Sequence, residues 1–153
     1  SGMTRASKFG TAPNYLKTAD AGMGVIVQLE TPQALAQLEA IADVDGVDAI
    51  FIGPADLSAS MGHVGQFTHP AVMQAMADAA RRCKALGKPI GTVGGTPDSV
   101  TQYRALGYDF LAVSSDMGLL MSGALAAAKA LRGLSDEPHV HTLHAGTRTD
   151  ASA

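Results

Sequence analysis

A strict alternation of two sequence patterns constrains the fold most. Four short apolar runs, rich in the β-branched residues that favour strands, lie at residues 24–30, 48–53, 89–93 and 110–113. Each run is followed by a segment with helical spacing of apolar residues or with helix-capping residues, at residues 32–43, 72–86, 97–106 and 116–132. The sequence therefore predicts successive strand–helix units, which are typical of a parallel sheet covered by helices.

Capping residues mark the ends of the expected helices. Thr31 and Thr96 each precede a proline, so each is a good N-cap with proline at the first helical position. Gly87 and Gly107 follow the second and third helices and are expected to end them.

A long segment without helical period separates the second strand from its helix. Residues 54–69 are expected to form a loop, and His63 and His69 are interpreted as solvated side chains within it; an approach of either to the substrate is the alternative. Cys83 falls on the apolar face of the following helix and is interpreted as a packing residue.

Two architectures contain such a run of units. One is a small doubly wound sandwich, and the other is half of a (β/α)₈ barrel, because a whole barrel needs about 250 residues. Residues 1–24 carry no clear period, which is unusual at the start of a self-contained sandwich and favours the half-barrel. We expect residues 1–133 to belong to this domain and residues 134–153, which are polar, to form a flexible tail.

Composition and charge argue against several functional classes. The chain has 11 Lys and Arg against 14 Asp and Glu, a net charge of -3, and no basic run, so no nucleic-acid partner is expected. The most lipid-like stretch, residues 117–128, is too short to span a bilayer, and no signal-peptide pattern opens the sequence, so no membrane partner is expected. The single cysteine cannot form an internal disulfide, which favours a reducing compartment, and we expect a cytoplasmic protein.

The candidate site lies where the strands end, because both architectures place their active face at the carboxyl edge of the parallel sheet. Glu30 and Asp56 each follow an almost fully apolar strand at this edge. Neighbouring strands lie about 4.8 Å apart, so two such carboxylates can converge on one point. A hard divalent cation would remove their mutual repulsion, and Mg²⁺ takes one or two carboxylates in proteins. Two unconnected cap or loop carboxylates are the alternative.

Glycine-containing turns follow the second and third strands. Gly53 allows a ligand to approach the backbone, and the N–H groups of Ala55 and Asp56 could receive a substrate carboxylate; an ordinary Gly-Pro turn is the alternative. The Gly-Thr-Val-Gly-Gly turn at residues 91–95 could instead cradle phosphate, although it lacks the lysine and glycine order of a P-loop. A phosphate-binding doubly wound enzyme and a non-catalytic α/β module that binds small acids therefore stay open as alternatives.

Three strings in order resemble the HpcH/HpaI family of class II pyruvate-dependent aldolases, which includes 4-hydroxy-2-oxoheptanedioate aldolase and 2-keto-3-deoxy sugar acid aldolases. They are Val-Gln-Leu-Glu-Thr at residues 27–31, Asp-Gly-Val-Asp at residues 45–48, and Phe-Ile-Gly-Pro-Ala-Asp-Leu-Ser at residues 51–58. The resemblance extends over residues 1–132. It implies an α/β fold of the (β/α)₈ TIM-barrel type, of which this chain resembles strands five to eight and their helices.

The resemblance also implies a ligand set. Glu30 and Asp56 match the two metal carboxylates, which would hold a divalent metal ion such as Mg²⁺, Mn²⁺, Co²⁺ or Zn²⁺. The resemblance also implies a set of substrate-binding residues. Gln28 would lie beside the metal and pyruvate, and the backbone of Gly53, Pro54 and Ala55 would surround the pyruvate carboxylate. Ser1 matches a serine that contacts the substrate.

The implied reaction is that of a carbon–carbon lyase. Such an enzyme makes or cleaves 4-hydroxy-2-oxo acids from pyruvate and an aldehyde through a pyruvate enolate. The family's catalytic histidine and its enolate-stabilising arginine lie in the N-terminal half, so no catalytic residue is expected in this chain. The expected partners are therefore the N-terminal half of the barrel and, in a homo-oligomer, other subunits that exchange the last helix.

Overall fold

The computed structural model describes residues 2–132, which divide into two units, one that ends at Ser114 and one that begins at Ser115. The predicted tail at residues 134–153 and the predicted substrate contact Ser1 lie outside the described residues. No helix within residues 2–132 is both long and apolar enough to cross a membrane.

The helical elements include all four predicted helices in order, with two exceptions at predicted boundaries. They are α1 (Tyr15–Thr18), the 3₁₀ turn η1 (Asp20–Gly22), α2 (Pro32–Ala36), α3 (Leu38–Ala42), α4 (Pro54–Ser60), α5 (Pro70–Leu86), α6 (Pro97–Leu106) and α7 (Asp116–Arg132). The predicted caps are confirmed: Thr31 Oγ1 accepts the Ala34 N–H at 3.1 Å, and Gly87 and Gly107 adopt left-handed φ values of 65° and 96°.

The two exceptions concern predicted boundaries. The single helix expected at residues 32–43 is broken at Gln37, whose backbone leaves the helical region (φ -104°, ψ 14°), giving α2 and α3. The prediction of a loop over all of residues 54–69 was also wrong. The first part of this segment forms α4, with Pro54 at the first helical position and Leu57 buried. A helix of seven residues is too short to display a periodic apolar face, so the sequence pattern gave no signal for it.

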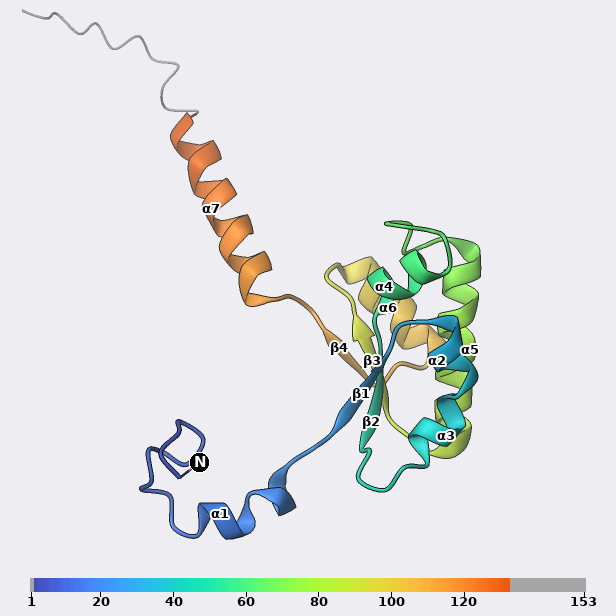
Figure 1. The fold of residues 1–153 in the computed structure, drawn as a ribbon. Coiled ribbons are helices and arrows are strands. Elements are labelled where there is room, and N and C mark those ends of the chain that lie inside the picture. The colour runs from blue at the N-terminus through green and yellow to red at the C-terminus, as the bar shows by residue number, and fades with distance from the viewer. Residues whose placement is uncertain (1, 133–153) are drawn as a thin grey trace, which may run out of the picture. The chain divides into compact units, whose positions relative to one another are not determined.

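The sheet is parallel and its strands follow the chain order. The strands β1 (Ile26–Leu29), β2 (Ala49–Ile52), β3 (Ile90–Val93) and β4 (Phe110–Ala112) pair in the order β1-β2-β3-β4. Figure 1 shows helices α2 to α6 on one face of this sheet. A doubly wound fold covers both faces and reverses its strand order, so the doubly wound alternative is wrong and the order is that of successive barrel units.

The strand register separates a helix-covered face from an open face. One row of paired residues, Leu29, Ile52, Thr92 and Leu111, belongs to the core beneath the helices. That core includes Cys83, whose predicted packing role is confirmed, and burial raises the pKa of its thiol to about 11. The adjacent row, Gln28, Phe51, Gly91 and Phe110, points to the other face because successive side chains of a strand alternate.

Gly91 shapes the open face of the sheet. The Phe110 ring occupies the space where a side chain on Gly91 would lie, and it reaches Phe51 at a ring-centroid distance of 6.1 Å. On the same face, Ile26 and Val93 remain 54% and 44% exposed. The open face is therefore an apolar surface with aromatic packing across three strands.

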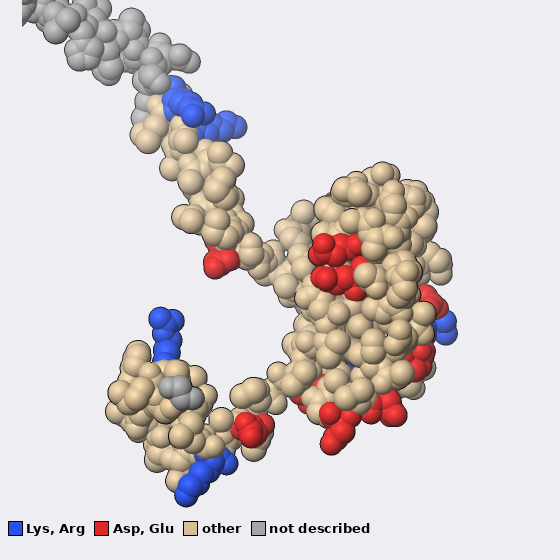
Figure 2. All heavy atoms as spheres, in the orientation of Figure 1, with Lys and Arg blue, Asp and Glu red and all other residues tan. Residues whose placement is uncertain are grey.

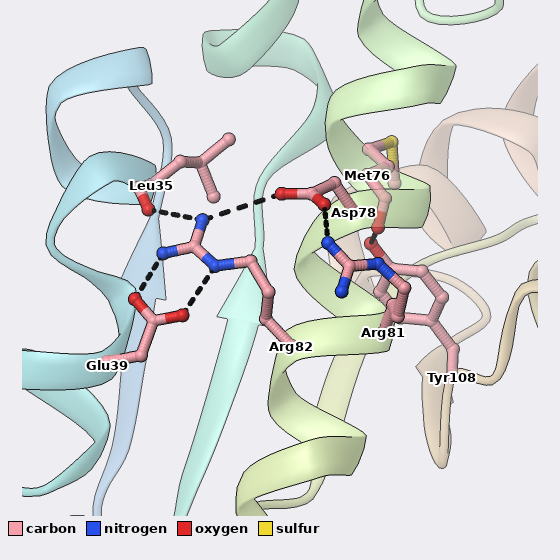
Figure 3. A network of polar contacts seen from close by, with 7 residues as sticks. All are labelled: Leu35, Glu39, Met76, Asp78, Arg81, Arg82 and Tyr108. Carbon is pink, nitrogen blue, oxygen red and sulfur yellow. Dashed lines mark hydrogen bonds and ion pairs between the residues drawn. The ribbon is translucent and has the colours of Figure 1, made fainter.

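A charged network ties α2, α3 and α5 together on the outside of the sheet (Figure 3). Arg82 Nε donates to Glu39 Oε1 at 2.6 Å, and Arg82 Nη1 donates to the backbone oxygen of Leu35 at 2.8 Å. The hydrogen bond from Arg82 lowers the pKa of the Glu39 carboxyl to about 2. Arg82 thereby links the break between α2 and α3 to the long helix α5.

We expect the Glu39–Arg82 pair to make the fold sensitive to acid. The Glu39 carboxyl has an ordinary pKa of 4.5 in the unfolded chain and a pKa of about 2 in the fold. Stability from the pair is complete above the unfolded pKa and is lost as the pH falls toward 2, because the unfolded chain takes up the proton first. Urea unfolding should show a smaller difference between the protein and a Glu39→Gln variant at about pH 3 than at about pH 6. An equal difference at both pH values would contradict this role.

Candidate functional site at the carboxyl edge of the sheet

The carboxyl end of β1 places Gln28 and Glu30 side by side. Gln28 Nε2 donates a hydrogen bond to Glu30 Oε1. Ser60 at the end of α4 donates from its hydroxyl to the backbone oxygen of Glu30 at 3.0 Å. The Glu30 carboxylate is thus oriented by its neighbour on the strand, and the Glu30 backbone is held against α4.

Gly53, the residue after β2, makes room for these two side chains. A Cβ atom at this position would lie 2.9 Å from Gln28 Nε2 and 3.0 Å from Glu30 Cγ, and it would also overlap Glu30 Oε1. The Glu30 carboxylate therefore lies directly against the backbone at the end of the neighbouring strand. Any side chain other than hydrogen at position 53 would displace it.

Asp56 lies in the first turn of α4, not in a loop as predicted. The partial positive charge at a helix N-terminus favours a carboxylate in the first turn. No side chain caps this end of α4, so the backbone N–H groups of Ala55 and Asp56 in the first turn donate no hydrogen bond to a capping side chain. Asp56 is exposed, so its carboxylate is accessible to a ligand.

An open cleft of about 500 Å³ adjoins these residues. Its walls come from the end of β1, the start of α4, the segment before α5, the end of β3 and the start of α6: Gln28, Gly53, Pro54, Ala55, Asp56, Phe67, Thr68, Val93, Gly94, Gly95, Thr96, Ser99 and Tyr103. Five residues predicted for the site share this cleft, whereas Glu30 contacts Gln28 and the Gly53 backbone at its border without lining it.

The charge at this site is negative. Neither Glu30 nor Asp56 forms an ion pair with a Lys, Arg or His side chain of residues 2–132, and Asp56 is the only charged residue among those that line the cleft. Figure 2 shows a mainly acidic charged surface on the drawn face of the sheet-and-helix part. An anionic ligand would therefore be repelled here unless a cation joined it.

The donor set at this edge fits a hard cation. The part of the chain that the structure describes contains no group of three or more His, Cys, Asp or Glu residues that could hold a metal ion. Two carboxylates that follow neighbouring strands are nevertheless sufficient for Mg²⁺ or Mn²⁺, because these ions keep water or substrate oxygens in their other coordination positions. The space that Gly53 leaves for the Glu30 carboxylate fits such a role, and a shared ion between Glu30 and Asp56 stays a prediction.

Comparison with known proteins decides the family. The sequence model of the HpcH/HpaI aldolase/citrate lyase family matches residues 4–123. The chain belongs to this family. The predicted resemblance is confirmed over most of the chain.

Two curated aldolases are similar to the chain over about half of their own length. The chain is 50% identical over 129 residues to 2-dehydro-3,6-dideoxy-6-sulfogluconate aldolase of Pseudomonas putida, covering 84% of this chain and 51% of that protein. It is 50% identical over 130 residues to the pyruvate aldolase of Rhizobium etli, covering 84% of this chain and 50% of that protein. The chain therefore spans about half the length of the curated relatives it matches.

A solved HpcH/HpaI structure agrees with the fold. A family protein from Burkholderia cenocepacia superimposes with a TM-score of 0.72 at 41% identity, covering 86% of this chain and 51% of that one. Macrophomate synthase gives a TM-score of 0.61 at 27% identity over 88% of this chain.

The far wall of the cleft consists of residues that were not predicted from the sequence. Thr96, Ser99 and Tyr103 line it from α6 and the residue before it, and Phe67 and Thr68 line it from the segment before α5. The spacing of Thr96, Ser99 and Tyr103, at i, i+3 and i+7, places them on one helix face and was the available signal. Phe67 and Thr68 lie outside any periodic segment, so no sequence pattern indicated them.

Proposed function

We propose that the complete protein is a class II aldolase that makes or cleaves 4-hydroxy-2-oxo acids from pyruvate and an aldehyde. The observation that carries the proposal is the packing of the Glu30 carboxylate against Gly53 at the same edge as Asp56. The family membership and the names of the relatives, which are aldolases, support it. The negative charge of the edge also supports it, because an anionic 2-oxo acid requires a cation there.

Glu30 and Asp56 would hold the divalent ion. No His or Cys of residues 2–132 is among the residues that line the cleft, which favours Mg²⁺ or Mn²⁺ over Co²⁺ or Zn²⁺. Such an ion supplies Lewis-acid polarisation of a keto oxygen. Gln28 orients the Glu30 carboxylate through its Nε2 hydrogen bond.

The backbone after β2 would position the 2-oxo acid. Gly53, Pro54 and Ala55 line the cleft, and the N–H groups of Ala55 and Asp56 lie at the uncapped start of α4, where they can donate to a substrate carboxylate. Tyr103, Phe67 and Val93 add apolar walls that exclude water from one side of the cleft. These residues bind and orient, and we propose that the proton-transferring base lies in the other half of the barrel.

The N-terminal half of a (β/α)₈ barrel is the partner we propose for the open face of the sheet. This chain would supply strands five to eight. The apolar row across β2, β3 and β4, with Phe51 and Phe110 in ring contact, is suited to a barrel interior that other strands close. The coverage of about half of each relative supports the same conclusion.

The exchange of the last helix within a homo-oligomer is also part of this proposal. α7 has no buried residue, and Leu119, Leu120 and Leu125 are more than 60% exposed. Leucines at this exposure in one helix are suited to packing against another chain.

Calorimetric titration of the complete protein tests the proposed chemistry. We expect Mn²⁺ to bind more tightly in the presence of oxalate, a stable analogue of the pyruvate enolate, and oxalate to bind more tightly in the presence of Mn²⁺ by the same factor. A bound cation lowers the repulsion that the two carboxylates exert on the anion, so the coupling is expected to be at least about tenfold. Independent binding of the two ligands would contradict the proposal.

A further inference from the structure

His63 and His69 form a stacked pair between α4 and α5. Their ring centroids lie 3.5 Å apart and their planes differ by 17°. Both residues lie in the segment between α4 and α5, as predicted, and both are half-buried rather than fully solvated. Backbone hydrogen bonds fix the pair at both ends: the His63 N–H donates to Ser58 O at 2.7 Å and the His69 N–H donates to Gln66 O at 3.0 Å.

His69 also caps helix α5. Its Nδ1 atom accepts a hydrogen bond from the Ala71 N–H at 3.2 Å, which satisfies one of the unpaired amides in the first turn of this 17-residue helix. A histidine can accept at Nδ1 only while that nitrogen carries no proton. The observed cap therefore requires a neutral His69 ring.

The pair holds a wall of the cleft. Phe67 and Thr68 line the cleft and directly precede His69 in the chain. Their backbone lies between the turn that begins at His63 and the start of α5, so the stack and the cap together fix the position of this wall. The sequence signal for the cap alone was a histidine immediately before a proline that starts a helix.

Few charged groups lie on the elements that flank the pair. α4 carries a single titratable residue, Asp56, and the nearest on α5 is Asp78, more than two turns into the helix. Glu30 reaches α4 only through the hydrogen bond from Ser60 to its backbone oxygen. Neither histidine forms an ion pair within residues 2–132, so no carboxylate in that range offsets a positive charge on both rings.

We propose that the His63–His69 stack is a proton-sensitive latch on the cleft wall. With neutral rings, the stack and the Nδ1 cap hold residues 61–69 in place. Protonation removes the acceptor at Nδ1, which releases the Ala71 amide, and two charged rings in face-to-face contact repel each other. Mild acid is therefore the condition under which we expect the wall to loosen.

Hydrogen exchange measured by mass spectrometry on the complete protein tests the latch. After correction for the intrinsic pH dependence of exchange, we expect protection of the segment around residues 61–73 to fall about fivefold between pH 8 and pH 5.5, the size of a typical cap contribution. Peptides from the middle of α5 serve as the internal control and should keep their protection. Equal protection of residues 61–73 at both pH values would overturn the proposal, with no variant needed.

A His69→Asn variant supplies the matched control, because asparagine is a good N-cap that does not titrate. This variant should lose the pH dependence while keeping protection at pH 8 close to that of the parent protein.

A His63→Phe variant keeps a ring for stacking but carries no charge, and its loss of protection in acid should be smaller than that of the parent. If His69→Asn loses protection in acid as much as the parent does, another group is responsible and the latch is wrong. The readout needs no catalysis, so it is independent of the proposed aldolase activity.

Discussion

Replacing Glu30 by glutamine, or Asp56 by asparagine, is expected to abolish metal-dependent exchange of the pyruvate methyl protons in the complete protein. Each change removes one negative charge at nearly constant volume, so the cation loses a ligand while the fold keeps its packing. We expect a loss of at least about a hundredfold in the exchange rate, the size typical for removal of one electrostatic stabiliser at an active site. Proton NMR in deuterated buffer measures the exchange directly. The added metal is Mg²⁺ without Mn²⁺, because paramagnetic Mn²⁺ broadens the proton signals.

An Asp43→Asn variant is the matched control for these two substitutions. Asp43 is an exposed carboxylate that follows α3 and contributes nothing to the walls of the site cleft. It should exchange pyruvate protons at the parent rate. Normal exchange in both Glu30→Gln and Asp56→Asn would refute the metal role, whereas equal loss in Asp43→Asn would point to a general effect of lost charge.

Substituting Gly53 by alanine is expected to weaken metal binding without removing any ligand. The backbone at Gly53 (φ -89°, ψ 98°) suits any residue, so alanine causes no backbone strain. Its methyl group, however, would overlap Glu30 and lie 2.9 Å from Gln28 Nε2, which forces both side chains to move. Displacement of groups that orient a ligand typically costs about 10- to 100-fold in metal affinity, and we expect that loss in Mn²⁺ titrations.

A Gly22→Ala variant controls for the loss of a glycine, because a Cβ atom there would meet no other atom within 4 Å. Its affinity for Mn²⁺ should match that of the parent protein. Unchanged affinity in Gly53→Ala would show that the Glu30 carboxylate is not the group that binds the ion.

The strand–helix alternation predicted the architecture well because it rests on patterns that tertiary contacts rarely override. The predicted strands, the two threonine caps and the two glycine ends were all confirmed, since each depends on a local backbone preference. The failures came from short elements. α4 and the break at Gln37 are set by packing over fewer than two turns, where propensity carries little weight.

The candidate site was predictable only in part. The rule that active groups gather at the carboxyl edge of a parallel sheet selected Gln28, Glu30, Gly53 and Asp56, and the first three are in contact. The stacking of His63 on His69 could not be foreseen, because it depends on the path of an aperiodic segment that only the folded chain defines. Whether Glu30 and Asp56 share one ion was likewise beyond the sequence, since side-chain direction at a strand end is set by neighbours such as Gly53.

A crystal structure of the complete protein with Mn²⁺ and oxalate, recorded with anomalous diffraction, tests the central claim most directly. We expect one manganese peak with a carboxylate oxygen of Glu30 and one of Asp56 each about 2.1 Å away, the range typical of small hard cations with oxygen ligands. A manganese peak elsewhere, or one that only a single one of these two carboxylates reaches, would contradict it.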